Sequence, residues 1–479
     1  MSSVQRTAES TPVPAPRLGA LATVLVAGGV LALLSTTVVG VAVPDLADDL
    51  RVSEADASWV ATVALLAAGV AIPLSGWATT RFGTRATWLV ALGLFAVGLA
   101  ASALAPTFPV LVVARVVQGL GAGALEPIML TALARAVDPA RMGRVMGSAA
   151  AAMSIGPLLG PVTGGFLVGT VGWRAVFGVL AVAAAALWVV SLLVVRDDER
   201  APAALDLMGL LLLSAGTTAL LAGFSRAAAP DGVDPLAIAL VVGGALALLA
   251  FVRWARRRGT TAIVDLGTFS ARGYGAAVGV MALLGAAVYP AFFGLPQLFQ
   301  SVGGLSPAAA GLLVAPYGLG TLIAMPLTGR LSDSVSTGLL VRVGAGVAAV
   351  GFAGYPLAGM LDGAARVALY AVLGLVVGLG IGSVGSPTVS SIYRALPPAR
   401  IAPGTTILFV TNQLGGALGV AVLAGIVGIL GGGRWDADVA GWPLTVPVVA
   451  CLAVAGLSAR LASADAADTA GAGRATAGA

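Results

Sequence analysis

Long apolar stretches recur along almost the whole of this 479-residue chain. A helix needs about 20 mostly apolar residues to cross a bilayer. Only 10% of the residues are charged, whereas soluble domains carry about 25%. The sequence therefore predicts an all-α membrane protein with fourteen transmembrane helices. These lie near 19–43, 57–79, 86–105, 108–131, 144–169, 173–195, 206–226, 235–254, 274–299, 307–329, 338–360, 365–387, 403–430 and 441–461.

Arginine is distributed unevenly among the loops between these stretches. All 26 basic residues are arginine; if the N-terminus is cytoplasmic, 20 fall inside, five outside and Arg115 within a helix. Cytoplasmic loops of membrane proteins carry an excess of basic residues. The asymmetry predicts a protein of the cytoplasmic membrane with both termini inside. We expect cytoplasmic tails at 1–18, where the sequence is polar and contains proline, and at 463–479, both of them disordered. Basic charge spread over many loops on one membrane face argues against nucleic-acid binding.

Two of the predicted cytoplasmic loops resemble each other. Each follows the second helix of a six-helix block, so we expect one bundle at 19–195 and another at 273–462, with 196–272 supplying two inserted helices and a loop. Duplicated bundles around a central cavity are typical of transporters. Loops rich in glycine and arginine are also common between membrane helices, so the pair alone is a weak signal. The predicted gating residues in these loops are Gly76, Arg81, Gly83, Arg85 and Asp333.

Glycine and proline are closely spaced in the stretch at 144–169. Such residues let a neighbouring helix approach backbone to backbone, and proline removes a hydrogen-bond donor and bends the helix. Ordinary small-residue packing is the alternative interpretation. The residues of this pattern are Gly147, Gly156, Gly160, Pro161, Gly164 and Gly165.

Three segments of the chain resemble motifs of the major facilitator superfamily. The glycine pattern is similar to its antiporter motif, the loop at 76–85 to its cytoplasmic gating motif, and 115–123 to its third signature motif. With fourteen helices, the chain resembles the 14-helix drug:proton antiporter branch over roughly residues 20–460. The resemblance implies two six-helix bundles plus two extra helices, alternating access, and export of drug-like molecules in exchange for protons.

The chain departs from this branch at three positions. Ser35 stands where the branch often has an aspartate tied to proton coupling or to cationic substrates. Thr80 replaces the usual acid of the gating loop, and Ala64 replaces a tyrosine. The first two departures weaken a direct transfer of proton coupling from the family to this chain.

Arg115 and Glu126 are charged residues within the fourth stretch. Burying an arginine in hydrocarbon costs at least about 2.5 kcal/mol unless it meets water or a partner. Eleven residues make three helical turns plus about 20°, so both face the same way, together with Gln118. We predict that Arg115, Gln118 and Glu126 line the cavity and that Glu126 is the proton-responsive group. The alternatives are an arginine that braces helices through backbone carbonyls and a glutamate that reaches the cytoplasmic interface.

Further polar side chains lie within the predicted ninth and thirteenth helices. They could line a substrate cavity or equally bond to a neighbouring helix. Likewise, Arg81 and Arg85 are either gate residues or ordinary cytoplasmic loop charge. The cavity candidates are Tyr289, Gln297, Asn412 and Gln413.

The residue inventory limits the possible functions. Histidine is absent and Cys451 is the only cysteine, so a membrane-embedded enzyme or a metal site has few candidate groups. The chain lacks a phosphate-binding loop of the GxxxxGK[ST] type, so energy must come from an ion or solute gradient. We expect an exporter that exchanges a drug-like molecule for protons. Its other partners are membrane lipids, and it acts as a monomer without cofactors or metals. A metabolite importer or uncoupled facilitator of the same superfamily is the alternative.

Overall fold

The computed structural model describes residues 15–52, 54–138, 141–153, 155–196, 200, 203–227, 234–431 and 441–477, and the elements in these ranges are all helical. Lipid offers no hydrogen-bond partners to the backbone, so each apolar segment satisfies its own N–H and C=O groups by forming a helix. Twelve of the described helices are long and apolar enough to cross a membrane. The chain is therefore an all-α, multi-pass membrane protein, as predicted.

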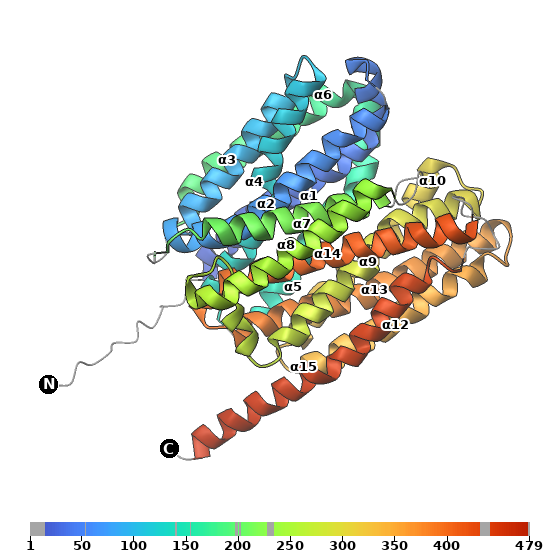
Figure 1. The fold of residues 1–479 in the computed structure, drawn as a ribbon. Coiled ribbons are helices and arrows are strands. Elements are labelled where there is room, and N and C mark those ends of the chain that lie inside the picture. Colours follow the sequence, from blue (N-terminus) through green and yellow to red (C-terminus); the bar gives the residue numbers. More distant parts are fainter. Residues whose placement is uncertain are drawn as a thin grey trace.

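The first group of helices is drawn in blue to green in Figure 1. α1 packs against α6, α2 against α4, and α3 against both α4 and α6. Within α6 the backbone of Gly172 has φ 76°, so the helix is broken there and its two parts run in different directions. The bounds are α1 (Ala15–Leu50), α2 (Glu54–Phe82), α3 (Thr84–Ala103), α4 (Phe108–Ala136), α5 (Met142–Met153) and α6 (Ile155–Val194).

The second group follows the same pattern of long helices packed side by side. α13 packs against α11 and α12, and α9 packs against α14 and α15. Its bounds are α9 (Tyr274–Ser301), α10 (Pro307–Leu312), α11 (Ala315–Leu331), α12 (Thr337–Ala358), α13 (Gly363–Ala395), α14 (Pro398–Gly431) and α15 (Thr445–Ala477).

Between the two groups in sequence, α7 (Leu207–Ala227) and α8 (Pro235–Arg258) form a hairpin, followed by short 3-10 helices η2 (Gly259–Thr261) and η3 (Leu266–Ser270). Asp234 caps α8 by accepting a hydrogen bond from the backbone of Ala237. It also pairs with Arg226 at 2.6 Å. The hydrogen bond from Arg226, and then the one from Ala237, lower the pKa of the Asp234 carboxyl. These contacts join the end of α7 to the start of α8.

The predicted count of fourteen transmembrane helices is not confirmed. Two predicted ranges are missing from the twelve candidate spans. The range 144–169 is divided between α5 and the first part of α6, and 441–461 contains an apolar segment of 17 residues, Thr445–Leu461. At the C-terminus the structure differs from the expected disordered tail, because α15 continues through Ala477. This extension is rich in alanine, the strongest helix former. The expected N-terminal tail falls largely on residues 1–14, outside the described residues.

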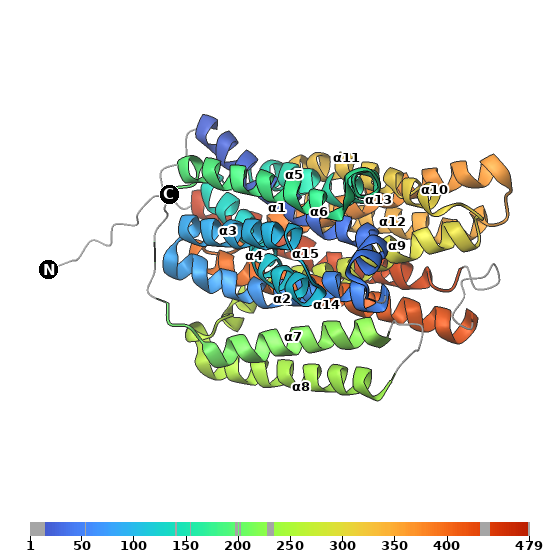
Figure 2. The same cartoon turned by 90° about the horizontal axis from the view of Figure 1, so that it is seen from above.

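The two groups meet along two lines of contact, which together we call the seam. On one side, α5 of the first group packs against α11 and α13 of the second. On the other side, α2 and α4 pack against α14, and α7 contacts both α2 and α14. Figure 2 shows α7 and α8 as a separate layer along this side. The hairpin therefore covers the seam where α2 meets α14.

Arginine gathers at one end of the molecule, here called the arginine-rich end. Successive long helices alternate in direction, so the last turns of every second one lie together. Figure 2 shows α1 beginning and α15 ending at a common end of the helices. The last turns that carry arginine at the arginine-rich end are those of α2, α4, α8, α11 and α13, with Arg81, Arg135, Arg256, Arg257, Arg258, Arg330 and Arg394.

Candidate functional site

Arg115 is buried inside the first group and fully engaged there. Its Nε donates to the backbone carbonyl of Val60 on α2 at 3.0 Å, and its Nη1 donates to Gln118 Oε1 at 2.5 Å. Gln118 in turn donates to Ser35 Oγ on α1 at 3.2 Å. The guanidinium also lies 5.6 Å from the ring centroid of Phe177 on α6. Arg115 and Gln118 thus connect α4 with α1 and α2 through hydrogen bonds and with α6 through a cation–π contact, and these contacts offset the cost of burying the charge.

Glu126 lies elsewhere on α4, in the half of the helix nearer the arginine-rich end. Its side chain is partly buried. It is close enough to the phenols of Tyr289 on α9 and Tyr393 on α13 to interact electrostatically with them. Both tyrosines belong to the second group, so the carboxylate of Glu126 faces across the seam. A carboxylate in this position can meet a solute or a proton that reaches the space between the groups.

The structure brings Arg115 and Gln118 together but does not join them to Glu126. Among the described residues, the polar contacts of Arg115 stay within the first group, whereas the electrostatic partners of Glu126 come from the second group. The face of α4 that these three residues share therefore has two parts. Arg115 and Gln118 brace the helices of the first group, and Glu126 faces the seam. Of the two predicted alternatives for Arg115, the contact with Val60 matches the brace.

Backbone atoms of the two groups approach each other closely where α5 meets α11. A Cβ atom added at Gly147 would lie 2.6 Å from the carbonyl oxygen of Met325 and 3.0 Å from Cα of Gly329. A Cβ atom added at Gly329 would lie 2.9 Å from Cα of Gly147. These neighbours are backbone atoms, which cannot move aside as a flexible side chain can. The two groups therefore touch backbone to backbone at this point.

Asp333 adds a polar contact to the same junction. Its Oδ1 accepts a hydrogen bond from the backbone N–H of Gly143, in the first turn of α5, at 2.9 Å. Arg394, at the end of α13, lies 3.5 Å from the same oxygen. A carboxylate at a helix N-terminus is favoured by the helix dipole and by the free N–H groups there. The predicted gate residue Asp333 thus joins the two groups at the arginine-rich end.

In the first predicted gating loop, the side chains of Thr80 and Arg85 bond within the first group. Arg85 donates to the backbone carbonyl of Leu192 at the end of α6, at 2.9 Å. Thr80, in the position of the missing acid, donates to the carbonyl of Gly76 in its own helix, at 3.0 Å. Gly83 has φ 85° and permits the turn into α3. Arg81 is exposed. The structure therefore places only the second loop on a contact between the groups.

Two glycines of the predicted pattern, Gly147 and Gly156, have surroundings that the structure describes. Gly147 faces α11 and α13, whereas a Cβ atom at Gly156 would lie 2.9 Å from Leu33 Cβ on α1. Gly147 lies on α5 and Gly156 on α6, so the two glycines serve different helix contacts. The surroundings of the other residues of the pattern, Gly160, Pro161, Gly164 and Gly165 on α6, lie outside the described structure.

The four candidate cavity residues have different surroundings. Tyr289 is 38% exposed and faces Glu126. Asn412 donates to the carbonyl of Met281 on α9 at 2.9 Å, so it bonds to a neighbouring helix, one of the two expected roles. Gln297 is exposed and Gln413 is partly buried. Of these four candidates, Tyr289 is the one for which the described structure gives an electrostatic interaction with Glu126.

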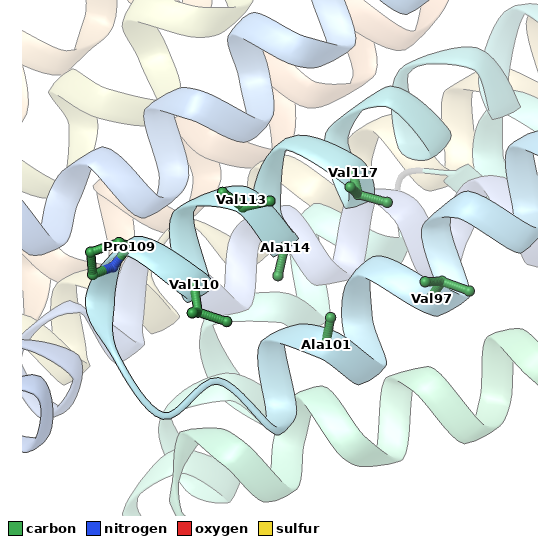
Figure 3. Close-up of a pocket in the computed structure, with 7 residues that line it drawn as sticks. All are labelled: Val97, Ala101, Pro109, Val110, Val113, Ala114 and Val117. Atoms are coloured by element: carbon green, nitrogen blue, oxygen red, sulfur yellow. The ribbon is translucent and has the colours of Figure 1, made fainter.

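A groove on the outside of the first group is separate from all of these residues. It has a volume of about 370 Å³ and lies between α3 and α4 (Figure 3). Its lining is wholly apolar, and Val97 and Val113 are more than 60% exposed. The groove offers no group that could select a polar solute or bind a proton.

Sequence reasoning missed Gly143, Tyr393 and Arg394 as partners in these contacts. Gly143 lies one helical turn before Gly147 and therefore on the same face, which is a signal that the spacing contained. Tyr393 and Arg394 lie at the end of a long apolar stretch, where the sequence alone predicts an ordinary membrane-interface position. Their pairing with Glu126 and Asp333 depends on how the two groups dock.

Two helical groups that meet at a seam, with a carboxylate facing across it, define the class of multi-pass membrane transporters. The family model of the Major Facilitator Superfamily matches residues 25–420, and the chain belongs to this superfamily. The Mycobacterium tuberculosis protein called multidrug resistance protein B homolog is 34% identical over 407 residues, covering 84% of this chain and 74% of that protein. The tetracenomycin C resistance and export protein of Streptomyces glaucescens is 30% identical over 400 residues, covering 83% and 73%.

Solved structures show the same fold. The human organic anion transporter MFSD10 has a TM-score of 0.65 and 17% identity, covering 92% of this chain and all of that one. The proton:xylose symporter XylE, bound to a glucose analogue, has a TM-score of 0.65 and 18% identity, covering 92% and 95%. Identities this low support the fold alone. The chain is thus a small-molecule transporter of the Major Facilitator Superfamily.

Proposed function

We propose that the protein exports a drug-like molecule or antibiotic across the cytoplasmic membrane in exchange for protons. Relatives named for multidrug resistance and for tetracenomycin C export support this direction and substrate class. The observation that carries the proposal is the position of Glu126. It lies on the first group and faces phenols of the second, in a seam closed at the arginine-rich end by Gly147, Gly329 and Asp333.

Proton exchange requires a group that gains and loses a proton between the two facings of the transporter. Arginine keeps its proton in proteins, and the chain has no histidine. The position of the usual acid in α1 is Ser35, which accepts a hydrogen bond from Gln118. Glu126 is the carboxylate of the first group that faces the seam. It binds the proton in one state and releases it, or exchanges it for the solute, when the groups reorient.

The test uses Glu126→Gln, which keeps the shape of the side chain and removes its titration. The purified protein is placed in proteoliposomes, and uptake of ethidium or tetracenomycin C is measured with and without an imposed pH gradient. We expect the variant to lose gradient-driven transport and to retain binding and energy-independent exchange. Asp362→Asn is the matched control, because that carboxylate is 99% exposed at the start of α13. Gradient-driven transport by Glu126→Gln with an unchanged pH dependence would overturn the role of Glu126.

The finer topology is also part of the proposal. We propose fourteen spans, in which α5 with the first part of α6, and the segment Thr445–Leu461, complete the count. The arrangement is a six-helix bundle at 19–195, inserted helices at 196–272 and a second bundle at 273–462, with the arginine-rich end and both termini in the cytoplasm. The transporter functions as a monomer and is not an enzyme. A C-terminal reporter active only outside the cell would contradict this topology.

The alternative function is import or uncoupled facilitation of a metabolite. The glycine pattern of the antiporter motif favours export. The same vesicles separate the two, because a solute added to a coupled antiporter releases protons, and a facilitator moves solute without them.

A further inference from the structure

We propose that the inner face of α7, marked by Ser214 and Thr218, forms part of the wall of the transport pathway and donates hydrogen bonds to the transported solute. This inference rests on the proposed transport function. It assigns the inserted hairpin a part in solute recognition, in addition to covering the seam.

The direction of this face follows from the packing of α7. Its glycines Gly216 and Gly223 face α8, where added Cβ atoms would lie 2.7 Å from Leu248 and 2.8 Å from Val241. Ser214 and Thr218 are each two residues from Gly216, about 200° around the helix in opposite senses, so both point away from α8. They are also one turn apart, which places them side by side.

The side of α7 that points away from α8 is the side that meets the seam. α7 packs against α2 of the first group and α14 of the second. A Cβ atom added at Gly69 on α2 would lie 3.9 Å from the hydroxyl oxygen of Thr218. The two hydroxyls are therefore aimed at the line along which the two groups must move relative to each other during alternating access.

Both hydroxyls lack a hydrogen-bond partner among the described residues. Ser214 is 6% exposed, and the oxygens of Ser214 and Thr218 are buried without a donor or acceptor. Their neighbour Thr217 is equally buried, but its hydroxyl donates to the carbonyl of Leu213 at 2.8 Å, as threonines in membrane helices commonly do. The same helix thus contains satisfied and unsatisfied hydroxyls, and the unsatisfied ones are those aimed at the seam.

A buried hydroxyl without a partner has given up its bonds to water and gained none, which is unfavourable. The cost disappears if the seam opens beside α7 in another state of the cycle, because water or solute then supplies the partner. Each free hydroxyl can both donate and accept a hydrogen bond. Its proton can bind a solute that carries acceptors such as carbonyl or ether oxygens. A solute with such oxygens gains bonds here that a purely hydrocarbon surface would not offer.

Cysteine labelling tests whether water reaches this face. Cys451 is the only cysteine, so a Cys451→Ala background allows single reporters to be introduced. We expect Ser214→Cys and Thr218→Cys to react with a charged, water-soluble thiol reagent in proteoliposomes, and tetracycline, an oxygen-rich solute, to slow the reaction. Ala215→Cys is the matched control, because it is adjacent in sequence and exposed on the outer surface of α7, where lipid excludes the reagent. Reporters at 214 and 218 that are as inert as the one at 215 overturn the proposal.

Transport measurements test the hydrogen bonds. Thr218→Val removes the hydroxyl and keeps the shape, and Thr217→Val does the same one position away. We expect Thr218→Val to raise the KM for tetracycline about 2- to 13-fold, the usual effect of one hydrogen bond, without lowering the melting temperature. Thr217→Val should lower the melting temperature and leave KM unchanged. Equal effects of the two variants on KM overturn the proposal. If Glu126→Gln abolishes coupling while Thr218→Val has no effect, the proposed function stands and the role of α7 fails.

Discussion

Gly147→Ala is the smallest change that tests the closed seam. The added methyl carbon would lie 2.6 Å from the carbonyl oxygen of Met325, 2.9 Å from the hydroxyl of Ser386 and 3.0 Å from Cα of Gly329. Ordinary contacts of a methyl group require about 3.5–4.0 Å. Two of these neighbours are backbone atoms of α11, so α5 and α11 must separate by a few tenths of an ångström to 1 Å, roughly the difference between these distances.

The size of the effect follows from the cost of overpacking. Inserting one methyl into a tightly packed contact costs about 1–3 kcal/mol. The contact joins the two groups, so the cost applies to the state that is closed at the arginine-rich end and disappears when that end opens. We therefore expect the ratio of closed to open molecules to fall about 5- to 150-fold.

Distances between spin labels on the two groups report this ratio. In the Cys451→Ala background, labels at Phe82 and Leu339, which are 47% and 52% exposed, lie on α2 and α12 near the arginine-rich end. Double electron–electron resonance should show a population at longer distance in Gly147→Ala. The control is Gly178→Ala on α6, because a Cβ atom there meets no atom within 4 Å. A distance distribution and transport rate equal to those of the control would refute the backbone-contact reasoning.

Three further predictions concern polar contacts. Asp333→Asn should lower the ratio of closed to open molecules, measured with the same spin labels, by about two- to fivefold, because a charge at the N-terminus of a helix contributes about 0.3–1 kcal/mol. An unchanged distance distribution would show that Asp333 does not hold the groups together. Arg115→Lys keeps the charge but cannot donate in two fixed directions, so the melting temperature in detergent should fall, and an unchanged value would argue against the brace. Asp234 has a lowered pKa through its hydrogen bond to Arg226, so its contribution to stability is present at neutral pH and is lost as the pH falls through the carboxyl's folded-state pKa. Asp234→Asn should therefore melt below the wild type at pH 7, and this difference should shrink in acid.

The membrane fold was predictable because hydrophobic length and arginine placement are local properties of the sequence. Lipid forces the backbone of each long apolar stretch into a helix, whatever the stretch packs against. The break in α6 at Gly172 falls between two predicted ranges. The helix count was harder to predict, because the stretch at 144–169 is divided between two elements and is not among the candidate spans. The segment 463–479 was expected to be a disordered tail. In the structure α15 continues through Ala477, and the alanine content of this segment favours a helix.

The candidate site was less predictable, because its contacts join residues far apart in sequence. Helical spacing placed Arg115 and Glu126 on one face of α4. The spacing does not show which other helices pack against Arg115 and which pack against Glu126. The bond from Arg115 to the carbonyl of Val60 and the approach of Glu126 to Tyr393 depend on the docking of other helices. Asp333 was identified from its loop, but its partner Gly143 lies 190 residues away.

The α7–α8 hairpin also bears on how the protein assembles during synthesis. The hairpin leaves the ribosome after the first group and before the second. Trp77 of α2 donates to the carbonyl of Ala203, just before α7, at 3.2 Å, so α2 and the start of the hairpin can associate as soon as both are inserted. On the later side, α7 packs against α14, and Asp265, in the segment after α8, lies 3.6 Å from Arg400 at the start of α14. We expect the hairpin to act as a template during translation: docked on the finished first group, it presents a surface against which α14, a late helix of the chain, is positioned.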